Sequence, residues 1–575
     1  MAALALYRSC RAVRFPRRLW LAAGRGQTPQ VLTDHPSPLP LRHSTVRFVV
    51  LRCVAVHAAI MAPCALTAQS AADTAAPRLQ RVEIVRHDIY DSADTRSWYT
   101  RAVNRAHVRT QRRVVERELL LRPGDILDSA RAAETGRNLR RLQVFRDVVV
   151  DTSADRSTLR VTTRDGWTTR PYTTFRSTGK QRLFSIGLNE SNFLGLAATL
   201  DVRYVQDPDR SLLRFSFGAP RIFSNRVSTG VFYNRLSDGS SAGFTIEQPY
   251  FSLSSRNSMR AGFVTFNGRV LRFRNGNPVA FDSLDRRFTL GTVNVSHAIR
   301  ASPRGYVRIG AEAQYRRDDF VPRRRPTPIA IPHSTTGAAI GYVDVSKAKY
   351  LLTKNYRLLG QPEDVDLSTT MRVGLAVAPK ALGYDRTAVG PMLYAQTGAR
   401  LPHGFATIVG RASGLASGGV VDSGTASVAG TFVLQPNRKH LFVAYGLSAW
   451  QRNSYPGSEF DLGLSRGPRA FELHAFTGDR MRYSLLEYRW TMFPQIGKSF
   501  AAGVAVFGET GGAWFNGSRP RYGKDAGVGL RYAPIRSASN IGATRLDLAR
   551  RFATDRQPAG WVVIVGTGFT FDAFR

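Results

Sequence analysis

The 575-residue sequence is poor in cysteine, in acidic residues and in long apolar runs, and each shortage excludes a class of protein. Its 3 cysteines are too few for a disulfide scaffold. No stretch approaches the roughly 18 uncharged apolar residues of a membrane helix, which excludes a helical membrane protein. Only 42 acidic residues stand against 81 basic ones. The hydrophobic content of 43% nevertheless indicates a folded chain rather than a disordered one.

The excess of positive charge has two interpretations. Most of the basic residues are arginines, and the formal charge of +39 suggests anionic partners: nucleic acid, phospholipid headgroups or acidic polysaccharide. The alternative is a codon-biased genome that uses arginine wherever a solvated cation is tolerated. Because the arginines are spread along the chain rather than clustered, we favour the second interpretation.

The amino-terminal residues read as targeting sequence. Residues 46–68 have the charged, apolar and small-residue order of a signal peptide, with cleavage expected after Ala68. Residues 1–45 are an arginine-rich extension: either the true start lies near Val46, or they form an organellar transit segment. Cleavage would remove all three cysteines, as suits a protein that crosses an oxidising periplasm. Residues 69–78 then form a short linker.

Residues 79–166 have the pattern of a small two-layer α/β module. Alternating apolar residues and capping signals predict the order strand, helix, helix, strand, strand. The expected segments are 79–85, 111–121, 129–141, 144–151 and 158–165.

Beyond Trp167 the helical periodicity stops, and segments of alternating character follow to the end of the chain. Leu213 and Phe215, for example, lie on one face of their segment, with Arg214 on the other. Period-two segments of about ten residues are typical of a transmembrane β-barrel, the one kind of sheet that satisfies every backbone group in lipid. A soluble β-helix, propeller or sandwich is the alternative; the lack of a fixed-period repeat disfavours the first two. Residues 167–575 are therefore expected to form an outer-membrane β-barrel.

Two groups of motifs resemble a known family. Residues 117–125, 134–142 and 145–148 resemble a POTRA domain, a periplasmic polypeptide-transport-associated module. Near the carboxyl end, four motifs keep the order of the same family's barrel: Arg469-Ala470-Phe471, Phe476-Thr477-Gly478-Asp479, Glu487-Tyr488-Arg489 and Phe507-Gly508-Glu509. The chain thus resembles the BamA/TamA-like outer-membrane protein superfamily, also known as the bacterial surface antigen family. Only one POTRA-like module is present, whereas the central assembly factors of the family carry several.

The resemblance and the pattern differ on the number of strands. The fold implied is mainly β, with a small periplasmic α/β POTRA domain before a transmembrane antiparallel barrel. The family barrel has sixteen strands, whereas the alternating segments number about twenty. Short segments around residues 330–430 are candidates for loop hairpins standing above the membrane, which would reconcile the two numbers.

The resemblance also implies a set of site residues in a loop that folds back into the barrel. In the family, an arginine at the loop tip is held by carboxylates on the barrel wall. The corresponding residues here are Arg469, Phe471, Gly478, Asp479, Glu487 and Glu509. Alternation independently places Glu487 opposite the apolar Leu486, so it should face inward, where a carboxylate can meet a guanidinium. Ala470 replaces the family's glycine, which changes the turn if the tip needs positive φ.

The first and last strands of the family barrel form a weak seam that opens sideways. Pro171 cannot donate to a ladder, and Gly560, Gly566 and Gly568 loosen the last strand. The alternative is that Pro171 simply precedes the strand. The chain end also resembles a terminal-strand targeting signal, carried by Phe569 with either Phe571 or Phe574.

No enzymatic motif is found, and we expect no catalytic activity, metal or cofactor. The resemblance implies an outer-membrane protein assembly or translocation factor, with its first domain in the periplasm. Its expected partners are outer-membrane lipids and lipopolysaccharide, unfolded β-barrel or secreted client proteins, and periplasmic lipoproteins, but not nucleic acid. The alternative is a passive porin or surface receptor barrel. The sequence identifies neither the client nor the partners.

Overall fold

The computed structural model describes residues 78–567 apart from ten short stretches and one longer one. These are 92–93, 179–180, 223–225, 274–276, 278–279, 281, 324–334, 454, 465, 498 and 539–542. The expected extension, the signal peptide and almost all of the linker lie outside the described residues. So do four of the expected site residues, Gly568, Phe569, Phe571 and Phe574.

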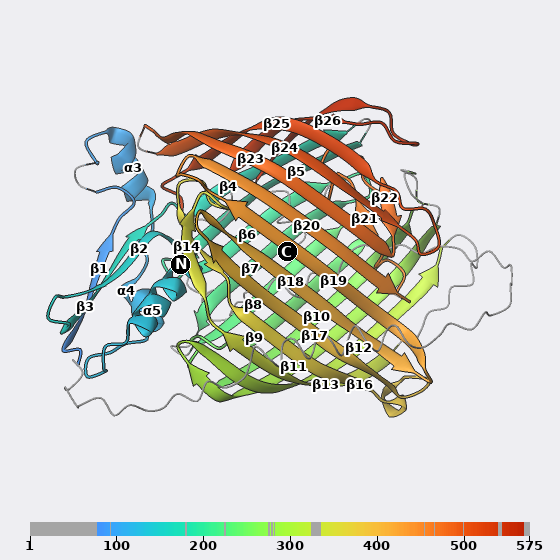
Figure 1. The fold of residues 1–575 in the computed structure, drawn as a ribbon, viewed down its shortest axis with the longest axis horizontal. Coiled ribbons are helices and arrows are strands. Elements are labelled where there is room, and N and C mark those ends of the chain that lie inside the picture. Colours follow the sequence, from blue (N-terminus) through green and yellow to red (C-terminus); the bar gives the residue numbers. More distant parts are fainter. Residues whose placement is uncertain are drawn as a thin grey trace, which may run out of the picture.

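The first part of the chain forms a three-stranded sheet packed against helices, here termed the N-terminal module (Figure 1). Its strands β1 (Arg81–His87), β2 (Phe145–Thr152) and β3 (Thr158–Asp165) have the order β1-β3-β2. Helices α4 (Arg112–Glu118) and α5 (Ser129–Arg141) cover the sheet, and the Asp128 side chain caps α5. The expected elements are thus found within a few residues.

One helix of the module was not expected from the sequence. Helix α3 (Trp98–Ala106) buries only Thr100 among its residues and leaves Trp98 76% exposed. Its apolar residues Trp98, Tyr99, Ala102, Val103 and Ala106 nevertheless follow a helical spacing, so periodicity could have indicated this helix and the sequence analysis missed it.

The rest of the chain forms a closed antiparallel barrel in which twenty strands pair among the described residues (Figure 1). Their bounds are β4 (Thr169–Thr178), β5 (Gln181–Phe193), β6 (Ala198–Gln206), β7 (Ser211–Ile222), β8 (Val227–Leu236), β9 (Gly239–Gln248), β10 (Asn257–Arg272), β11 (Asp282–Ser302), β12 (Gly305–Pro322), β13 (Thr335–Lys347), β16 (Thr369–Ala378), β17 (Ala388–Leu401), β18 (Gly404–Ser417), β19 (Val420–Leu434), β20 (His440–Arg452), β23 (Arg480–Ile496), β24 (Phe500–Trp514), β25 (Gly523–Pro534), β26 (Thr544–Arg551) and β27 (Gly560–Thr567). The barrel expected from alternation is confirmed.

The count of about twenty alternating segments is also confirmed, and the sixteen strands implied by the resemblance are wrong. The difference arises where hairpins above the membrane were expected: β13 and β16 to β19 are all strands of the barrel wall. Strands β16 to β19 are rich in glycine, alanine, serine and threonine, so their alternation is faint. Closing the barrel nevertheless pairs their backbone groups, whatever side chains they carry.

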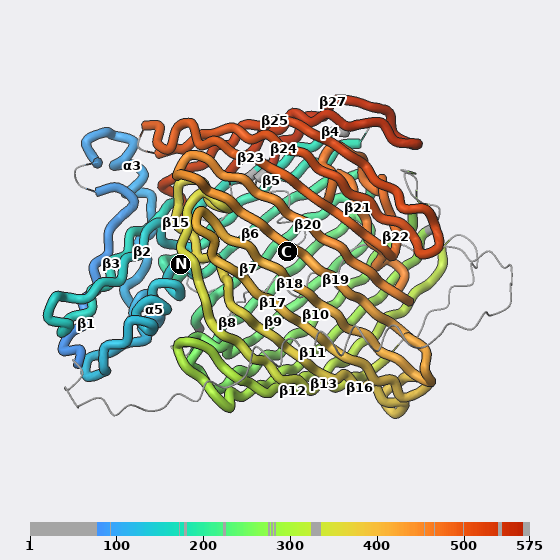
Figure 2. The backbone as a smooth tube through the Cα atoms, viewed as in Figure 1, coloured from blue at the N-terminus to red at the C-terminus, as the bar shows by residue number. Residues whose placement is uncertain are grey.

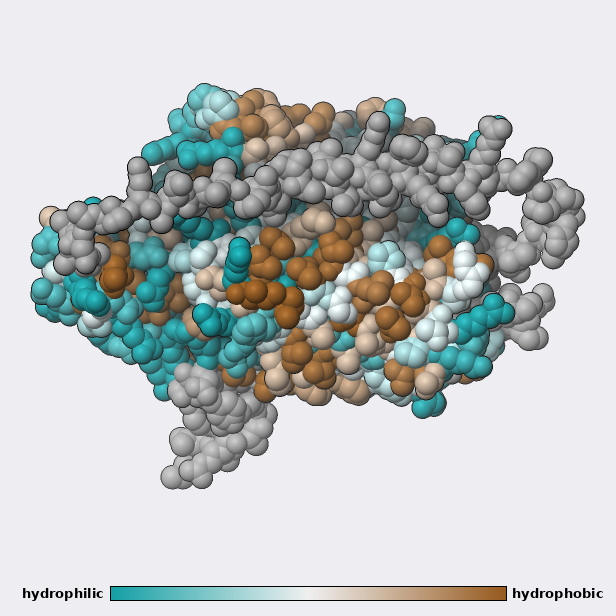
Figure 3. All heavy atoms as spheres, turned by 60° about the horizontal axis from the view of Figure 1, so that its bottom comes forward, coloured by the Kyte–Doolittle hydropathy of each residue, from teal (hydrophilic) through white to brown (hydrophobic). Residues whose placement is uncertain are grey.

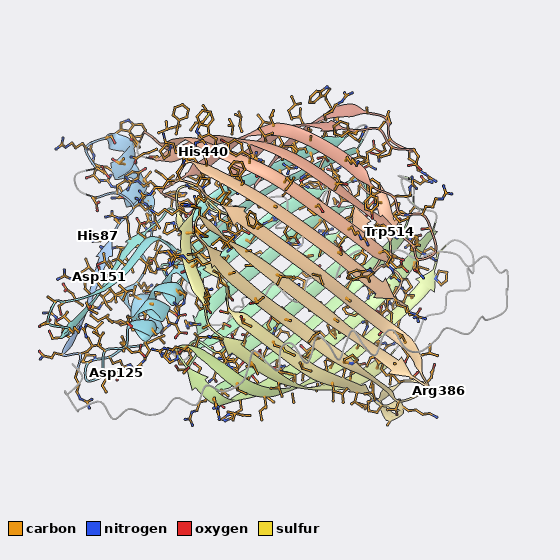
Figure 4. All side chains as sticks on the ribbon, in the orientation of Figure 1. His87, Asp125, Asp151, Arg386, His440 and Trp514 are labelled. Atoms are coloured by element: carbon orange, nitrogen blue, oxygen red, sulfur yellow. The ribbon has the colours of Figure 1, made fainter. Side chains whose placement is uncertain are left out.

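Two short hairpins lie off the barrel wall, one at each end. We term the end that carries the N-terminal module proximal and the opposite end distal. The hairpin of β14 (Tyr350–Lys354) and β15 (Pro362–Asp366) lies at the proximal end, and β21 (Phe460–Leu462) with β22 (Phe476–Gly478) lies at the distal end (Figure 2). A short 3-10 helix, η3 (Lys380–Leu382), follows β16. Figure 4 marks the two ends by His440, which is proximal, and by Trp514 and Arg386, which are distal.

The outer face of the barrel is apolar, as a lipid-facing surface must be. Leu486 in the middle of β23 is 68% exposed, and Trp561 and Val563 of β27 are 63% and 49% exposed. Figure 3 shows such residues gathered over the middle of the visible barrel face, with hydrophilic residues toward the N-terminal module. In the described part of the chain, no helix combines the length and the apolar character that crossing a bilayer requires.

The N-terminal module is fastened to the proximal end of the barrel by polar contacts. Glu134 of α5 accepts hydrogen bonds from the Leu253 amide and the Ser252 hydroxyl, in the connection between β9 and β10. Asn138 donates to the Phe251 carbonyl at 2.9 Å. Residues in the POTRA-like motifs therefore hold the module against the barrel as well as on its own sheet.

Candidate functional site: the luminal loop and the strand seam

The connection between β20 and β23, residues 453–479, folds into the distal half of the barrel, and we term it the luminal loop. Its β21–β22 hairpin packs with Phe471 and Ala475 against the inner wall, in a cluster that includes Ala449 and Ala513. On the opposite wall, Tyr455 packs beside Val270, Leu284 and Phe320. The loop therefore spans the lumen from one wall to the other.

Arg469 lies deep in the lumen and is 2% exposed. Its Nη2 and Nε donate to Oε1 of Glu509 at 2.6 and 3.0 Å, and its backbone N–H donates to Oε2 of the same carboxylate at 2.9 Å. Nη1 donates to Asp547 at 2.7 Å, and Nη2 reaches Glu487 at 3.4 Å. The guanidinium also stacks on the Phe507 ring at 3.6 Å. We term Arg469, Glu487, Glu509 and Asp547 the clamp cluster.

The three carboxylates of the clamp cluster come from neighbouring parts of the wall. Glu487 is on β23, Glu509 on β24 and Asp547 on β26, and each is 4% exposed or less. Strand alternation sends these side chains inward while their chain neighbours, such as Leu486, face outward. The inward orientation expected for Glu487 and Glu509 is therefore found in the structure. Burying such charges is tolerable only because each has charged partners.

The sequence analysis missed several members of this network. Asp547 bonds Arg531 at 2.6 Å as well as Arg469, and Arg489 bonds Glu487 at 2.5 Å. Tyr483 donates its hydroxyl to Glu509 at 2.9 Å. Alternation could have found Asp547, because it lies between the outward-facing Leu546 and Leu548.

The other expected members of the loop site are placed differently. Phe471 is fully buried and packs on Phe476, with ring centroids 5.3 Å apart. Gly478 lies in β22 at the distal rim, where a side chain would collide with the backbone of Trp514. Asp479 lies beside it and accepts a hydrogen bond from the Asn516 amide at 2.8 Å. Thus Gly478 and Asp479 shape the point where the loop joins β23, and they do not contact Arg469.

Ala470, where the family has glycine, does not have positive φ. Its amide donates to Asp525 at 2.9 Å, and its side chain is fully buried. The turn at the loop tip is therefore compatible with an ordinary L-residue, and the alanine imposes no strain.

The seam between the last strand, β27, and the first, β4, is the shortest junction of the barrel wall among the described residues. It has three paired positions: Val563 with Ser177, Ile564 with Arg176, and Val565 with Phe175. On either side, β26–β27 has eight and β4–β5 has ten. In the same register Gly566 would meet Thr174, but the two are not paired.

The seam residues expected from the sequence lie around this junction. Pro171 belongs to β4, opposite Leu188 of β5, so it does not merely precede the strand. It lies outside the three positions that pair with β27. Gly560 and Gly566 belong to β27, where they pair with Arg551 and Arg545 of β26.

The luminal loop reaches across the seam from inside. On the β4 side, Arg176 donates to the Leu464 carbonyl at 2.5 Å, and the Leu473 amide donates to Gln181 at 2.7 Å. On the β27 side, Arg551 of the adjoining β26 donates to the Ala470 carbonyl at 3.2 Å. The seam, short in its own ladder, is therefore bridged by the loop that the clamp cluster holds.

The proximal hairpin fills the lumen from the other end. Tyr356, between β14 and β15, is 1% exposed and packs edge-on against Phe405 at 5.0 Å. Its carbonyl accepts from Arg489 at 2.5 Å. Asn355 donates to the Arg438 carbonyl at 2.9 Å. Both ends of the lumen are thus occupied by the chain itself.

Within the part of the chain that the structure covers, no three His, Cys, Asp or Glu side chains are grouped so as to hold a metal ion. The carboxylates of the clamp cluster are instead neutralised by arginines.

These features define a class: a membrane-spanning β-barrel filled by its own loop and hairpin, with an α/β module at one end. No protein-family model matches the chain, and no curated protein matches it. Among solved structures, BamA from Haemophilus ducreyi lacking POTRA domains 1–3 is similar, with 12% identity, a TM-score of 0.35, and coverage of 85% of this chain and 84% of that one.

CdiB from Escherichia coli shares 12% identity over 86% of this chain and 77% of its own, with a TM-score of 0.44. The FrpB iron transporter from Neisseria meningitidis shares 8% identity over 85% and 91%, with a TM-score of 0.36. We rest the functional argument on the geometry of this chain.

Proposed function

We propose that this protein is an outer-membrane assembly or translocation factor that handles polypeptide clients at the seam between β27 and β4. The single observation that carries the proposal is the seam with three paired positions among the described residues, between strands that pair much more extensively with their other neighbours. Each ladder hydrogen bond contributes on the order of 1 kcal/mol, so the shortest ladder is the easiest to separate. Separated strands expose unpaired backbone groups, to which a client strand can add.

The luminal loop gives this seam a means of control. Arg176 and Gln181 on one side of the junction, and Arg551 on the other, all bond the loop. While Arg469 stays in the clamp cluster, those contacts bridge the junction. Release of the loop would leave the seam with its own short ladder alone.

The proposed orientation follows from the N-terminal module. In this proposal the module is a POTRA domain in the periplasm, so the proximal end of the barrel faces the periplasm. Strands β1 and β2 are the edges of its sheet, and an edge strand can receive an extended client or lipoprotein segment. The apolar belt contacts outer-membrane lipid, and surface arginines would meet lipopolysaccharide phosphates.

The alternative, a passive porin, needs a continuous water path through the barrel. Tyr356 and Phe471, both buried, instead occupy the lumen from opposite ends. A barrel filled in this way favours a gated or lateral process over free diffusion. We therefore keep the porin as an outcome of the test rather than as a second proposal.

Paired cysteines test the seam directly. Val563 pairs with Ser177 across the seam and with Leu548 of β26 inside the last hairpin. A disulfide between Val563→Cys and Ser177→Cys should abolish the function, because it locks the seam. A disulfide between Val563→Cys and Leu548→Cys is the matched control and should be tolerated. The native cysteines all lie within residues 1–64, so the introduced cysteines are the only ones in residues 65–575.

The functional readout is the level of other β-barrel proteins in the outer membrane of cells depleted of this protein and supplied with each variant. Loss of those proteins, restored by the control variant and by the reduced seam variant, supports the proposal. Equal loss with both disulfides would refute a seam mechanism. Unchanged barrels together with altered solute uptake would favour the porin.

A further inference from the structure

A polar cavity lies in the barrel wall near the proximal end, apart from the clamp cluster and the seam. Its volume is ≈ 190 Å³, far above the ~10–15 Å³ that one water needs. It is lined by inward-facing residues of β11, β12, β13, β16 and β17, which are consecutive in the wall, and by residues of β15 and of the β9–β10 connection. Neighbouring residues such as Ile309 and Val343 face outward and are 45% exposed. The cavity therefore opens inside the barrel, not toward lipid.

Arg308 forms one side of the cavity and is 7% exposed. Its guanidinium lies over the rings of Tyr250 and Tyr306, with its Cζ 3.5 and 3.4 Å from their centroids. Rings that cover the flat faces of a guanidinium leave only its in-plane N–H groups for other partners. The Arg308 Nε is buried and has no hydrogen-bond partner within the described part of the chain. Nη2 donates to the Leu253 carbonyl at 3.5 Å, so it is Nε that a carboxylate oxygen of a ligand would satisfy.

Asp344 is the cross-strand partner of Arg308 on β13, lines the same part of the cavity and is 5% exposed. Its Oδ2 accepts from Arg372 at 2.5 Å, whereas its Oδ1 is buried without a hydrogen-bond partner among the described residues. The Arg372 Nε is likewise buried without a hydrogen-bond partner among the described residues. A buried carboxylate oxygen left unpaired is costly, so this atom is suited to a hydroxyl donor from a ligand.

The remaining lining residues are hydroxyl-bearing or amide side chains, together with Asp366 of β15, whose Oδ1 accepts from the Ser368 amide at 2.9 Å. Tyr342 bonds Asn294 at 3.0 Å, and Tyr394 bonds Gln396 at 2.6 Å. The Tyr342 phenol oxygen has a lone pair with which it can accept a further hydrogen bond. The cavity thus offers an anion site at Arg308, an acceptor at Asp344 and several exchangeable hydroxyl partners.

We propose that this cavity binds one unit of an acidic sugar, a six-membered ring that carries a carboxylate and several hydroxyls. The carboxylate meets the edge of Arg308, and a ring hydroxyl donates to Oδ1 of Asp344. The inference does not depend on the seam or on the function proposed above. A free uronic acid and the terminal unit of an acidic polysaccharide share this chemistry, and the test includes both.

The α5 helix of the N-terminal module holds one wall of the cavity. Glu134 accepts from the Leu253 amide at 2.7 Å, and Asn138 bonds Phe251, the residue next to Tyr250. These contacts fix the connection that places the Tyr250 ring on Arg308. Ligand binding should therefore stabilise the contact between the module and the barrel.

Calorimetric titration of the purified full-length protein in detergent tests the proposal, with glucuronate as the probe. Saturable binding of glucuronate is expected. Glucose, which lacks the carboxylate, and acetate, which lacks the hydroxyls, should each bind at least about tenfold more weakly. A short oligoglucuronate distinguishes the sources: tighter binding than the monomer favours a polysaccharide end. Equal binding of glucuronate and acetate, or no saturable glucuronate binding, would overturn the proposal.

Two variants locate the site. Asp344→Asn should weaken glucuronate binding about tenfold, because a charge-assisted hydrogen bond becomes a neutral one. Asp319→Asn on the same β12–β13 wall is the matched control, because Asp319 pairs with Arg317 at 2.7 Å outside the cavity. Should Asp344→Asn not fold, Arg372→Lys keeps the charge and loses the planar guanidinium. Binding that is unchanged in the folded variant would refute this site.

Discussion

Arg140 of helix α5 and Asp364 of strand β15 form a two-bond ion pair, with Nε and Nη2 of the arginine 2.7 and 2.9 Å from the two carboxylate oxygens. The residues are 224 positions apart in the chain. One belongs to the N-terminal module and the other to the proximal hairpin in the lumen. Arg137 adds to this contact by lying 4.3 Å from the ring of Tyr350. The module is thus coupled directly to the element that fills the lumen.

The first prediction concerns this ion pair. Arg140→Ala should increase the amide hydrogen exchange of residues 350–366, because the hairpin loses its attachment to α5. Both side chains are about one-fifth exposed, so a coupling energy on the order of 1 kcal/mol is expected in a double-mutant cycle with Asp364→Ala. The control is the Arg112–Glu116 pair on α4, which is half exposed and should couple more weakly. Coupling no larger than in that control would mean that the hairpin is held without the module.

The second prediction concerns Arg469. Arg469→Met should destabilise the barrel by about 3–5 kcal/mol, because it leaves the carboxylates of the clamp cluster buried without their shared cation. The measurement is the free energy of unfolding in detergent, with the folded fraction monitored by heat-modifiable mobility on gels. Arg480→Met is the matched control, because Arg480 is the first residue of β23, directly after the loop, and is about one-quarter exposed, with Asp479 3.8 Å away. A similar small loss in both variants would show that the loop is held by its apolar packing instead.

The clamp residues on the wall could be predicted because their signal is local. Glu487 and Glu509 lie in strands whose other face is apolar, and alternation alone fixes which way they point. The same rule would have found Asp547. Helix α5 was predicted with the observed bounds because the signals for it, its cap Asp128 and the helical pattern that follows, come from residues adjacent in the sequence.

Other features depend on residues far apart in the chain and could not be predicted. Arg140 reaches Asp364, and His474 reaches Asp209, only because the barrel closes and the loop folds inward. The pattern gave the correct number of strands, but the expectation that segments around residues 330–430 stand above the membrane was wrong for a different reason. In β16 to β19 small residues face both lipid and lumen, so the contrast between faces that defines a barrel strand is weak.

The third prediction tests the lipid-facing surface. Leu486 is opposite Ala444 of β20 and Gly508 of β24, in the middle of all three strands, and is 68% exposed. Leu486→Arg should lower the free energy of unfolding in lipid vesicles by about 2–4 kcal/mol, the cost of an arginine at the bilayer midplane.

The same substitution nearer the membrane surface is the control for depth. Phe500→Arg, at the proximal start of β24, should cost only about 0–1 kcal/mol. Equal costs at the two positions would contradict the assignment of the middle of β23 to the bilayer centre.

The last prediction concerns pH and His474 in the luminal loop, outside the membrane-spanning strands. Its ring lies between Asp461, 2.6 Å from Nδ1, and Asp209, 3.1 Å from Nε2, and it stacks on Phe273. Burial alone would lower the pKa of His474, but the two carboxylates outweigh it and raise the pKa from 6.5 to about 9. The protonated ring therefore ties the loop to the β6–β7 turn.

Because the folded pKa is raised, this stabilisation is complete below pH 6.5 and is lost as the pH rises through about 9. The loss should reach roughly 3 kcal/mol at most, as expected for a shift of this size. Thermal unfolding of the protein in detergent, measured between neutral and alkaline pH, should show a fall that His474→Gln removes. His440→Gln is the control, because that histidine bonds Tyr488 at the proximal end, away from the loop. A fall that persists unchanged in His474→Gln would assign the pH dependence to another group.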